Sequence, residues 1–96
     1  MSRAIDQMKL KAAAEHLEWV LAQYPDSDAI RSLSDMLGPM IDDARSGRVR
    51  EPIAWRTLPG RRAFAEGVYR AFADPDVEAA CARFSIEMTG GWPGSY

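Results

Sequence analysis

The sequence predicts an all-α protein, a single-domain bundle of about four helices built on an N-terminal αα-hairpin. Apolar residues recur at spacings of three and four through long segments, which is the period of a helix with one buried face. Proline and glycine divide these segments at a few points, and no segment shows the alternation typical of a strand. We expect the helical domain to span residues 1–91 and residues 92–96 to form a C-terminal tail.

Length and composition set the broad class. The 96 residues are 47% apolar and 27% charged, with a formal net charge of -2. This balance is typical of a globular domain, and it gives no reason to expect a nucleic-acid partner. The apolar runs are too short to span a membrane, and the first residues lack the apolar segment of a signal peptide. We therefore expect a cytoplasmic protein with no membrane association.

The first helix is predicted within residues 2–23, where no proline or glycine interrupts the chain. Seven apolar residues lie within roughly 60° of Leu17 on a helical wheel, Leu17 included. They predict the face that packs into the core: Leu10, Ala13, Ala14, Leu17, Val20, Leu21 and Tyr24.

A second group of apolar residues lies on the opposite side of this helix. Ile5, Met8, Ala12 and Trp19 share that side with Glu15. The helix is then either sandwiched between two neighbours of its own fold, or it presents Met8 and Trp19 to a partner. The first interpretation is the more common one for a central helix of a bundle. Tryptophan is enriched among the residues that dominate binding energy at interfaces, which supports the second interpretation.

The Tyr24-Pro25 corner ends the first helix, because proline disfavours helical geometry in the residue before it. Asp26 or Ser27 is expected to cap the second helix. Its apolar stripe stays in register past Gly38-Pro39, which predicts one kinked helix that ends near Gly47. The stripe comprises Ala29, Ile30, Leu33, Met36, Leu37, Met40, Ile41 and Ala44, and the opposite face carries Arg31, Asp35, Gly38, Pro39 and Asp42.

Charge is segregated along the chain. Residues 45–62 hold six arginines against one acid, whereas residues 26–43 hold five acids against one arginine. The two segments either neutralise each other within the fold or form a polar surface matched to a partner.

Residues 47–60 show no helical period and form a long connection. A third helix is predicted from Arg61 to Ala73. Asp74 is expected to cap the fourth helix and Pro75 to occupy its first position. The inward residues would be Phe64, Ala65, Val68 and Phe72 in the third helix, and Val77, Ala80, Cys81, Phe84 and Met88 in the fourth. Trp92 and Tyr96 in the tail either cover the end of the bundle or project towards a partner.

The sequence contains no catalytic or cofactor motif. His16 is the single histidine and Cys81 the single cysteine, and no motif places a nucleophile, a base or a metal ligand beside either. Cys81 lies on an apolar stripe and is expected to act as a small buried hydrophobic residue. We therefore expect no enzymatic activity, no cofactor and no metal.

Several short features occur here in a recognisable order. A long helix ends in Gln23-Tyr24-Pro25, an arginine-bearing connection leads to Thr57-Leu58-Pro59-Gly60, and Asp74-Pro75-Asp76 opens the last helix. Over residues 10–88 the chain resembles the small all-helical immunity proteins that protect type VI secreting bacteria from their own NAD(P)-glycohydrolase effector. The resemblance implies a tight protein inhibitor that occludes the substrate cleft of a cognate toxin. It does not imply the toxin's chemistry, since related immunity proteins can oppose other enzymes, such as a nucleotide pyrophosphokinase.

The helical wheel, together with the positions of charged and aromatic residues, gives a candidate binding site. Its residues are Met8, Glu15, Trp19, Asp35, Asp42 and Trp92. The alternative function is a helical interaction module, such as a secretion chaperone or a homodimeric adaptor, and the sequence leaves the oligomeric state open.

Overall fold

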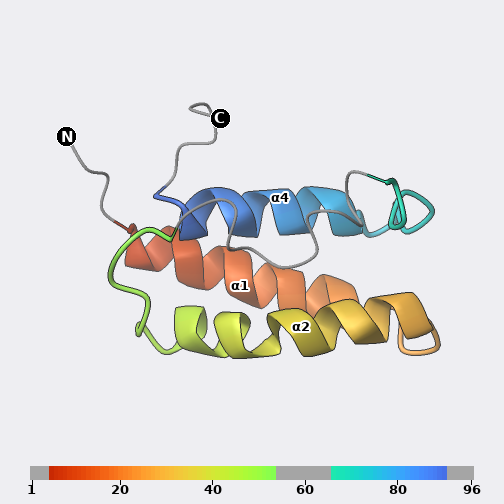
Figure 1. Ribbon diagram of the computed structural model, residues 1–96, viewed down its shortest axis with the longest axis horizontal. Helices are drawn as coiled ribbons and strands as arrows, with labels where there is room; N and C mark the ends of the chain where they lie inside the picture. Colours follow the sequence, from red (N-terminus) through yellow and green to blue (C-terminus); the bar gives the residue numbers. More distant parts are fainter. Residues whose placement is uncertain (1–4, 54–65, 91–96) are drawn as a thin grey trace.

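The computed structural model describes residues 5–53 and 66–90, and three α-helices make up most of these described residues. They are α1 (Gln7–Ala22), α2 (Asp28–Arg45) and α4 (Val77–Met88). Helix α1 lies between α2 and α4 and packs against both (Figure 1). Within the described ranges there is no strand, only an isolated bridge between Ala73 and Asp76. The all-α prediction is therefore confirmed.

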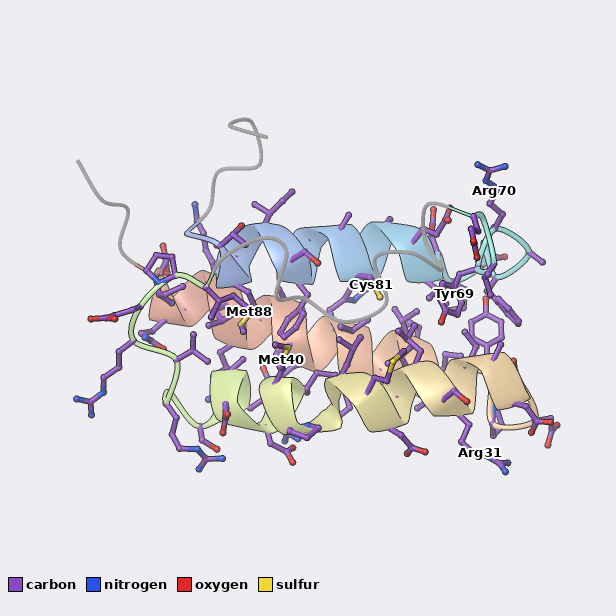
Figure 2. All side chains as sticks on the ribbon, in the orientation of Figure 1. Arg31, Met40, Tyr69, Arg70, Cys81 and Met88 are labelled. Carbon is purple, nitrogen blue, oxygen red and sulfur yellow. The ribbon has the colours of Figure 1, made fainter. Side chains whose placement is uncertain are left out.

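One continuous hydrophobic core joins the three helices. Figure 2 shows Cys81 and Met88 of α4 and Met40 of α2 directed towards α1. Full burial of a leucine or phenylalanine side chain contributes about 1.5–3 kcal/mol to stability, so this cluster dominates the fold. The stripe predicted for the last helix is confirmed, with Val77, Ala80, Cys81, Phe84 and Met88 buried in α4. Six of the seven residues predicted for the first helix are buried in α1, Leu10, Ala13, Ala14, Leu17, Val20 and Leu21, and the seventh, Tyr24, follows the helix and packs partly buried against the core.

Each helix begins where a short polar side chain caps it. The carboxylate of Asp6 accepts a hydrogen bond from the Lys9 backbone N–H, and the Ser27 hydroxyl accepts one from Ile30. Asp76 does the same for Ala79 at 2.9 Å. Such caps satisfy backbone donors that have no partner inside the helix. The prediction that Asp74 caps the last helix and that Pro75 occupies its first position is wrong, because the helix begins at Val77, two residues later, with Asp76 as its cap.

Helix α2 is a single element with Pro39 inside it, as the register of its stripe predicted. It ends with Gly47 at φ +74°, and the Arg48 N–H donates to the Asp43 carbonyl at 2.9 Å. This left-handed glycine and the hydrogen bond behind it form a Schellman cap. One inward residue was predicted wrongly: Met36 lies at the edge of the stripe and is 45% exposed.

Residues 66–73 do not form the predicted helix. Residues 66–71 are turns, and Gly67 has φ +76°, a left-handed conformation that ends any helix arriving from residue 66. In this segment Tyr69 is buried at 4% exposure, whereas Val68, which was predicted to face inward, is 45% exposed. The beginning of the predicted helix, with Phe64 and Ala65, lies outside the described residues.

The corner between α1 and α2 is fastened to the segment before α4. The Tyr24 hydroxyl donates a hydrogen bond of 2.7 Å to the Pro75 carbonyl. The Tyr24 ring also meets the Phe72 ring edge to face, with 5.0 Å between centroids. Tyr24 therefore joins two segments that are distant in sequence, the α1–α2 corner and residues 72–75.

The described part of the long connection lies against the other end of the helices. The Gln7 side chain donates to the Val49 carbonyl, and the Ile53 N–H donates to the Met88 carbonyl at 3.0 Å. Val49 and Ile53 pack on the core. Both ends of α1 are thus hydrogen-bonded to neighbouring segments, at Gln7 and at Tyr24. These bonds fix the position of the helix and of the residues on its solvent-exposed side.

Candidate partner-binding surface

The side of α1 that points away from the core is open to solvent. Met8 is 83% exposed and Trp19 is 56% exposed, and Ala12 and Glu15 between them are also exposed. We call these four residues the outer face of α1. Helix α1 does lie between two neighbours of its own fold, α2 and α4, but these four residues face neither of them. Ile5 departs from the predicted group, because it precedes the helix and is buried with the core.

Trp19 is held in a defined position on this face. Its indole ring stacks on the His16 ring, with 6.2 Å between centroids and 20° between the ring planes. The Gln23 side chain also lies near this face, because it donates to the backbone carbonyl of Trp19 at 3.0 Å. An exposed aromatic residue that is already ordered loses little conformational freedom when a partner covers it.

Charged residues border the outer face where α1 meets α2. Glu18 of α1 and Arg45 of α2 form an ion pair, in which Arg45 Nη1 lies 3.0 Å from both carboxylate oxygens. Both side chains are about half exposed, so the pair contributes at most about 1 kcal/mol to stability. Its main effect is to fix the position of two opposite charges beside the outer face.

A shallow polar depression lies along the same border. Its volume is about 460 Å³, and its walls consist of Lys11, Glu15, Asp42, Arg45, Ser46 and Arg48. Two of the predicted site residues, Glu15 and Asp42, are thus brought together from different helices. The mixture of charges gives the depression no strong affinity for a simple anion or cation, but it suits the polar rim of a protein interface.

The other predicted site residues are more scattered. Asp35 is exposed on α2 two turns before Asp42, and it does not line the depression. Trp92 lies outside the described residues. Sequence reasoning missed the contribution of Glu18, Arg45 and Arg48, because pairing across two helices depends on how they cross, and no spacing along the chain reports that.

The segregated charges are partly neutralised within the fold. Arg48 Nε lies 2.8 Å from Asp43 Oδ1, which joins the basic segment to the acidic one. Arg45 instead pairs with Glu18, outside the acidic segment. Arg31 donates to the Pro25 carbonyl, and Asp26, Asp28, Asp35 and Asp42 stay exposed. Four acids of α2 and its corner therefore remain available to solvent or to a partner.

Catalytic candidates are not evident in the part of the chain that is described. Burial, and secondarily the charge of Glu78, raises the pKa of the Cys81 thiol to about 12, so this thiol is protonated near neutral pH. Burial also raises the pKa of Tyr69. No cluster of three or more potential metal ligands exists among residues 5–53 and 66–90. In the same ranges, no helix has the length and apolar character needed to span a membrane.

In comparisons with known proteins, no family model, no curated protein and no solved structure matches this chain. The resemblance to immunity proteins rests on the short sequence features alone.

Proposed function

We propose that this protein is an immunity protein, which binds a cognate bacterial toxin or effector domain in the cytoplasm and neutralises it by occluding the toxin's active site. It would act by binding alone, without cofactor or chemistry of its own. The outer face of α1 would contact the toxin, and the polar depression beside it would form the rim of the interface.

The exposure of Trp19 and Met8 on the central helix is the observation that carries this proposal. The opposite side of α1 is fully buried, so these two side chains could have been polar at no cost to the core. Tryptophan supplies a large contact area with few rotatable bonds, and it dominates the binding energy of many interfaces. Two large exposed apolar residues on a well-supported helix are the expected form of a binding anchor.

The charges around this anchor support a partner of defined shape. Glu15, Glu18, Asp42, Lys11, Arg45 and Arg48 surround the border of α1 and α2 with both signs. A partner whose charges complement this pattern would be attracted to the surface, whereas a partner that places like charges opposite it would be repelled. A toxin inhibitor needs this selectivity, because it must find a single protein among many.

Co-expression tests the proposal. A gene adjacent to the one that encodes this chain should specify a protein that stops growth when expressed alone, and growth should return when this chain is co-expressed. Trp19→Ala should weaken the rescue at a matched expression level, whereas Met36→Ala should preserve it. The proposal fails if no adjacent gene product is toxic alone and tolerated in the presence of this chain.

Met36 is a suitable control because it is apolar and similarly exposed, but lies elsewhere. It is nine residues from Arg45 on α2, which places it about 180° around the helix. Arg45 faces α1 through its ion pair with Glu18, so Met36 lies on the flank of α2 away from that border.

A further inference from the structure

We propose that the outer face of α1 also binds a second copy of this chain, with the two α1 helices antiparallel, and so forms a weak symmetric homodimer. This inference does not depend on the toxin. It concerns what covers Met8 and Trp19 when no other partner is present.

The spacing of the outer face is the first reason. Met8, Ala12, Glu15 and Trp19 are separated by four, three and four residues, so the pattern reads the same from either end. This alternation is also the a and d spacing of a coiled coil. In an antiparallel pair, Met8 of each copy then lies opposite Trp19 of the other, and Ala12 lies opposite Glu15.

The facing residues suit one another. The thioether of an 83% exposed Met8 would lie against the indole of a 56% exposed Trp19, and this contact occurs twice by symmetry. A thioether sulfur and an aromatic ring attract each other when they lie about 5 Å apart. Ala12 is small enough to let the two helices approach at the centre. A parallel pair would instead place Glu15 against Glu15, with like charges facing each other.

The flanking charges are the second reason. Lys11 and Glu18 lie on the same flank of α1, seven residues apart. An antiparallel arrangement brings Lys11 of each copy next to Glu18 of the other, which gives two pairs of opposite charges. Arg45 already holds the Glu18 carboxylate beside the outer face at 3.0 Å. Lys11 would add a second cation to a carboxylate that is fixed in place.

The small size of the contact makes this dimer weak. A helix of 16 residues is about 24 Å long. One face of such a helix covers less than the roughly 800 Å² per partner of a standard stable interface. The dimer should therefore dissociate readily, and a tighter partner that uses the same face would displace the second copy.

Sedimentation equilibrium of the isolated full chain tests the dimer. The concentrations should run from about 10 μM to about 1 mM, which covers the dissociation constants expected of a weak dimer. The weight-average mass should rise from the monomer value of 10.7 kDa towards twice that value. Trp19→Ala should raise the dissociation constant at least about tenfold. A chain that stays monomeric throughout, or a Trp19→Ala variant that dimerises as the natural chain does, would overturn the proposal.

A charge-swap pair tests the antiparallel register. In its own dimer, the Lys11→Glu variant places its new carboxylate against Glu18 of the other copy, and the Glu18→Lys variant places its new ammonium group against Lys11. Each variant alone should therefore dimerise less well than the natural chain.

An equimolar mixture of the two variants should recover dimers. In the mixed dimer, the two carboxylates of the Lys11→Glu variant, at positions 11 and 18, face the two ammonium groups of the Glu18→Lys variant, at positions 18 and 11. A mixture that dimerises no better than the separate variants would contradict this register. Circular dichroism checks that both variants keep their helices.

Discussion

The hydroxyl group of Tyr24 donates a 2.7 Å hydrogen bond to the carbonyl of Pro75, 51 residues further along the chain. This bond, with the ring contact between Tyr24 and Phe72, joins the α1–α2 corner to the start of α4. It fixes one end of α1, the helix that carries the proposed binding face.

Tyr24→Phe should destabilise the protein by about 0.5–1.5 kcal/mol, since it removes the hydrogen bond and keeps the ring. Urea unfolding measures the change. Tyr24→Leu should cost more, because it also removes the edge-to-face contact with Phe72. If Tyr24→Phe leaves the free energy of unfolding unchanged, the bond to Pro75 contributes nothing to the fold.

Leu17 and Trp19 should respond in opposite ways to alanine substitution. Leu17 is completely buried, so Leu17→Ala should lower the free energy of unfolding by about 2–5 kcal/mol. Trp19 lies on the outer face, so Trp19→Ala should lower it by less than about 1 kcal/mol. Thermal or chemical unfolding of both variants gives the comparison. A large loss of stability for Trp19→Ala would mean that its main role is structural.

The period of apolar residues predicted α1, α2 and α4, and it correctly identified most of their buried positions. The prediction succeeded because each helix buries mainly one side, and the residues on one side of a helix recur every three or four positions in the sequence. It failed at residues 66–73, where Phe72 and Val68 keep a helical spacing but Gly67 adopts φ +76°. A glycine permits both helical and left-handed conformations, and only the tertiary contacts of Tyr69 and Phe72 select between them.

The candidate site was predictable only in part, for a related reason. The wheel placed Met8, Glu15 and Trp19 on one side of a helix, and the structure shows that side exposed. The ion pair between Glu18 and Arg45 was not predictable, because it depends on how α1 and α2 cross. Asp35 and Asp42 share a face of α2, yet only Asp42 lines the depression beside α1.

Pro39→Ala should stabilise the protein by about 1–3 kcal/mol. Pro39 is exposed in the interior of α2, where proline cannot donate to the carbonyl four residues earlier, that of Asp35. Alanine restores that donor and removes the clash of the proline ring. Differential scanning calorimetry should show a higher Tm. A lower Tm would mean that the shape imposed by Pro39 is needed for α2 to pack on α1.

Stability should fall in alkaline solution as Cys81 begins to ionise in the unfolded chain. The folded-state pKa of Cys81 is raised from an ordinary value of 9.0 to about 12, so its contribution is fully present below pH 9. As pH rises from about 9 towards about 12, the unfolded state loses this proton first, and stability declines by up to about 1.4 kcal/mol per pH unit.

Unfolding curves for Cys81→Ala should show a smaller decline over the same pH interval, even though the variant is less stable at pH 7. The natural chain should also react slowly with a thiol reagent at pH 8 until it is denatured. Equal alkaline declines in the two proteins would show that the Cys81 thiol is not the group responsible.

The most direct measurement of the proposed binding face is a calorimetric titration of the toxin identified by co-expression with three forms of this chain. The natural chain should bind at a ratio of about 1:1, and Met36→Ala should bind within about threefold of it. Trp19→Ala should bind at least about 30-fold more weakly, a loss of about 2 kcal/mol. Equal affinity of Trp19→Ala and the natural chain would contradict the claim that the outer face of α1 contacts the toxin.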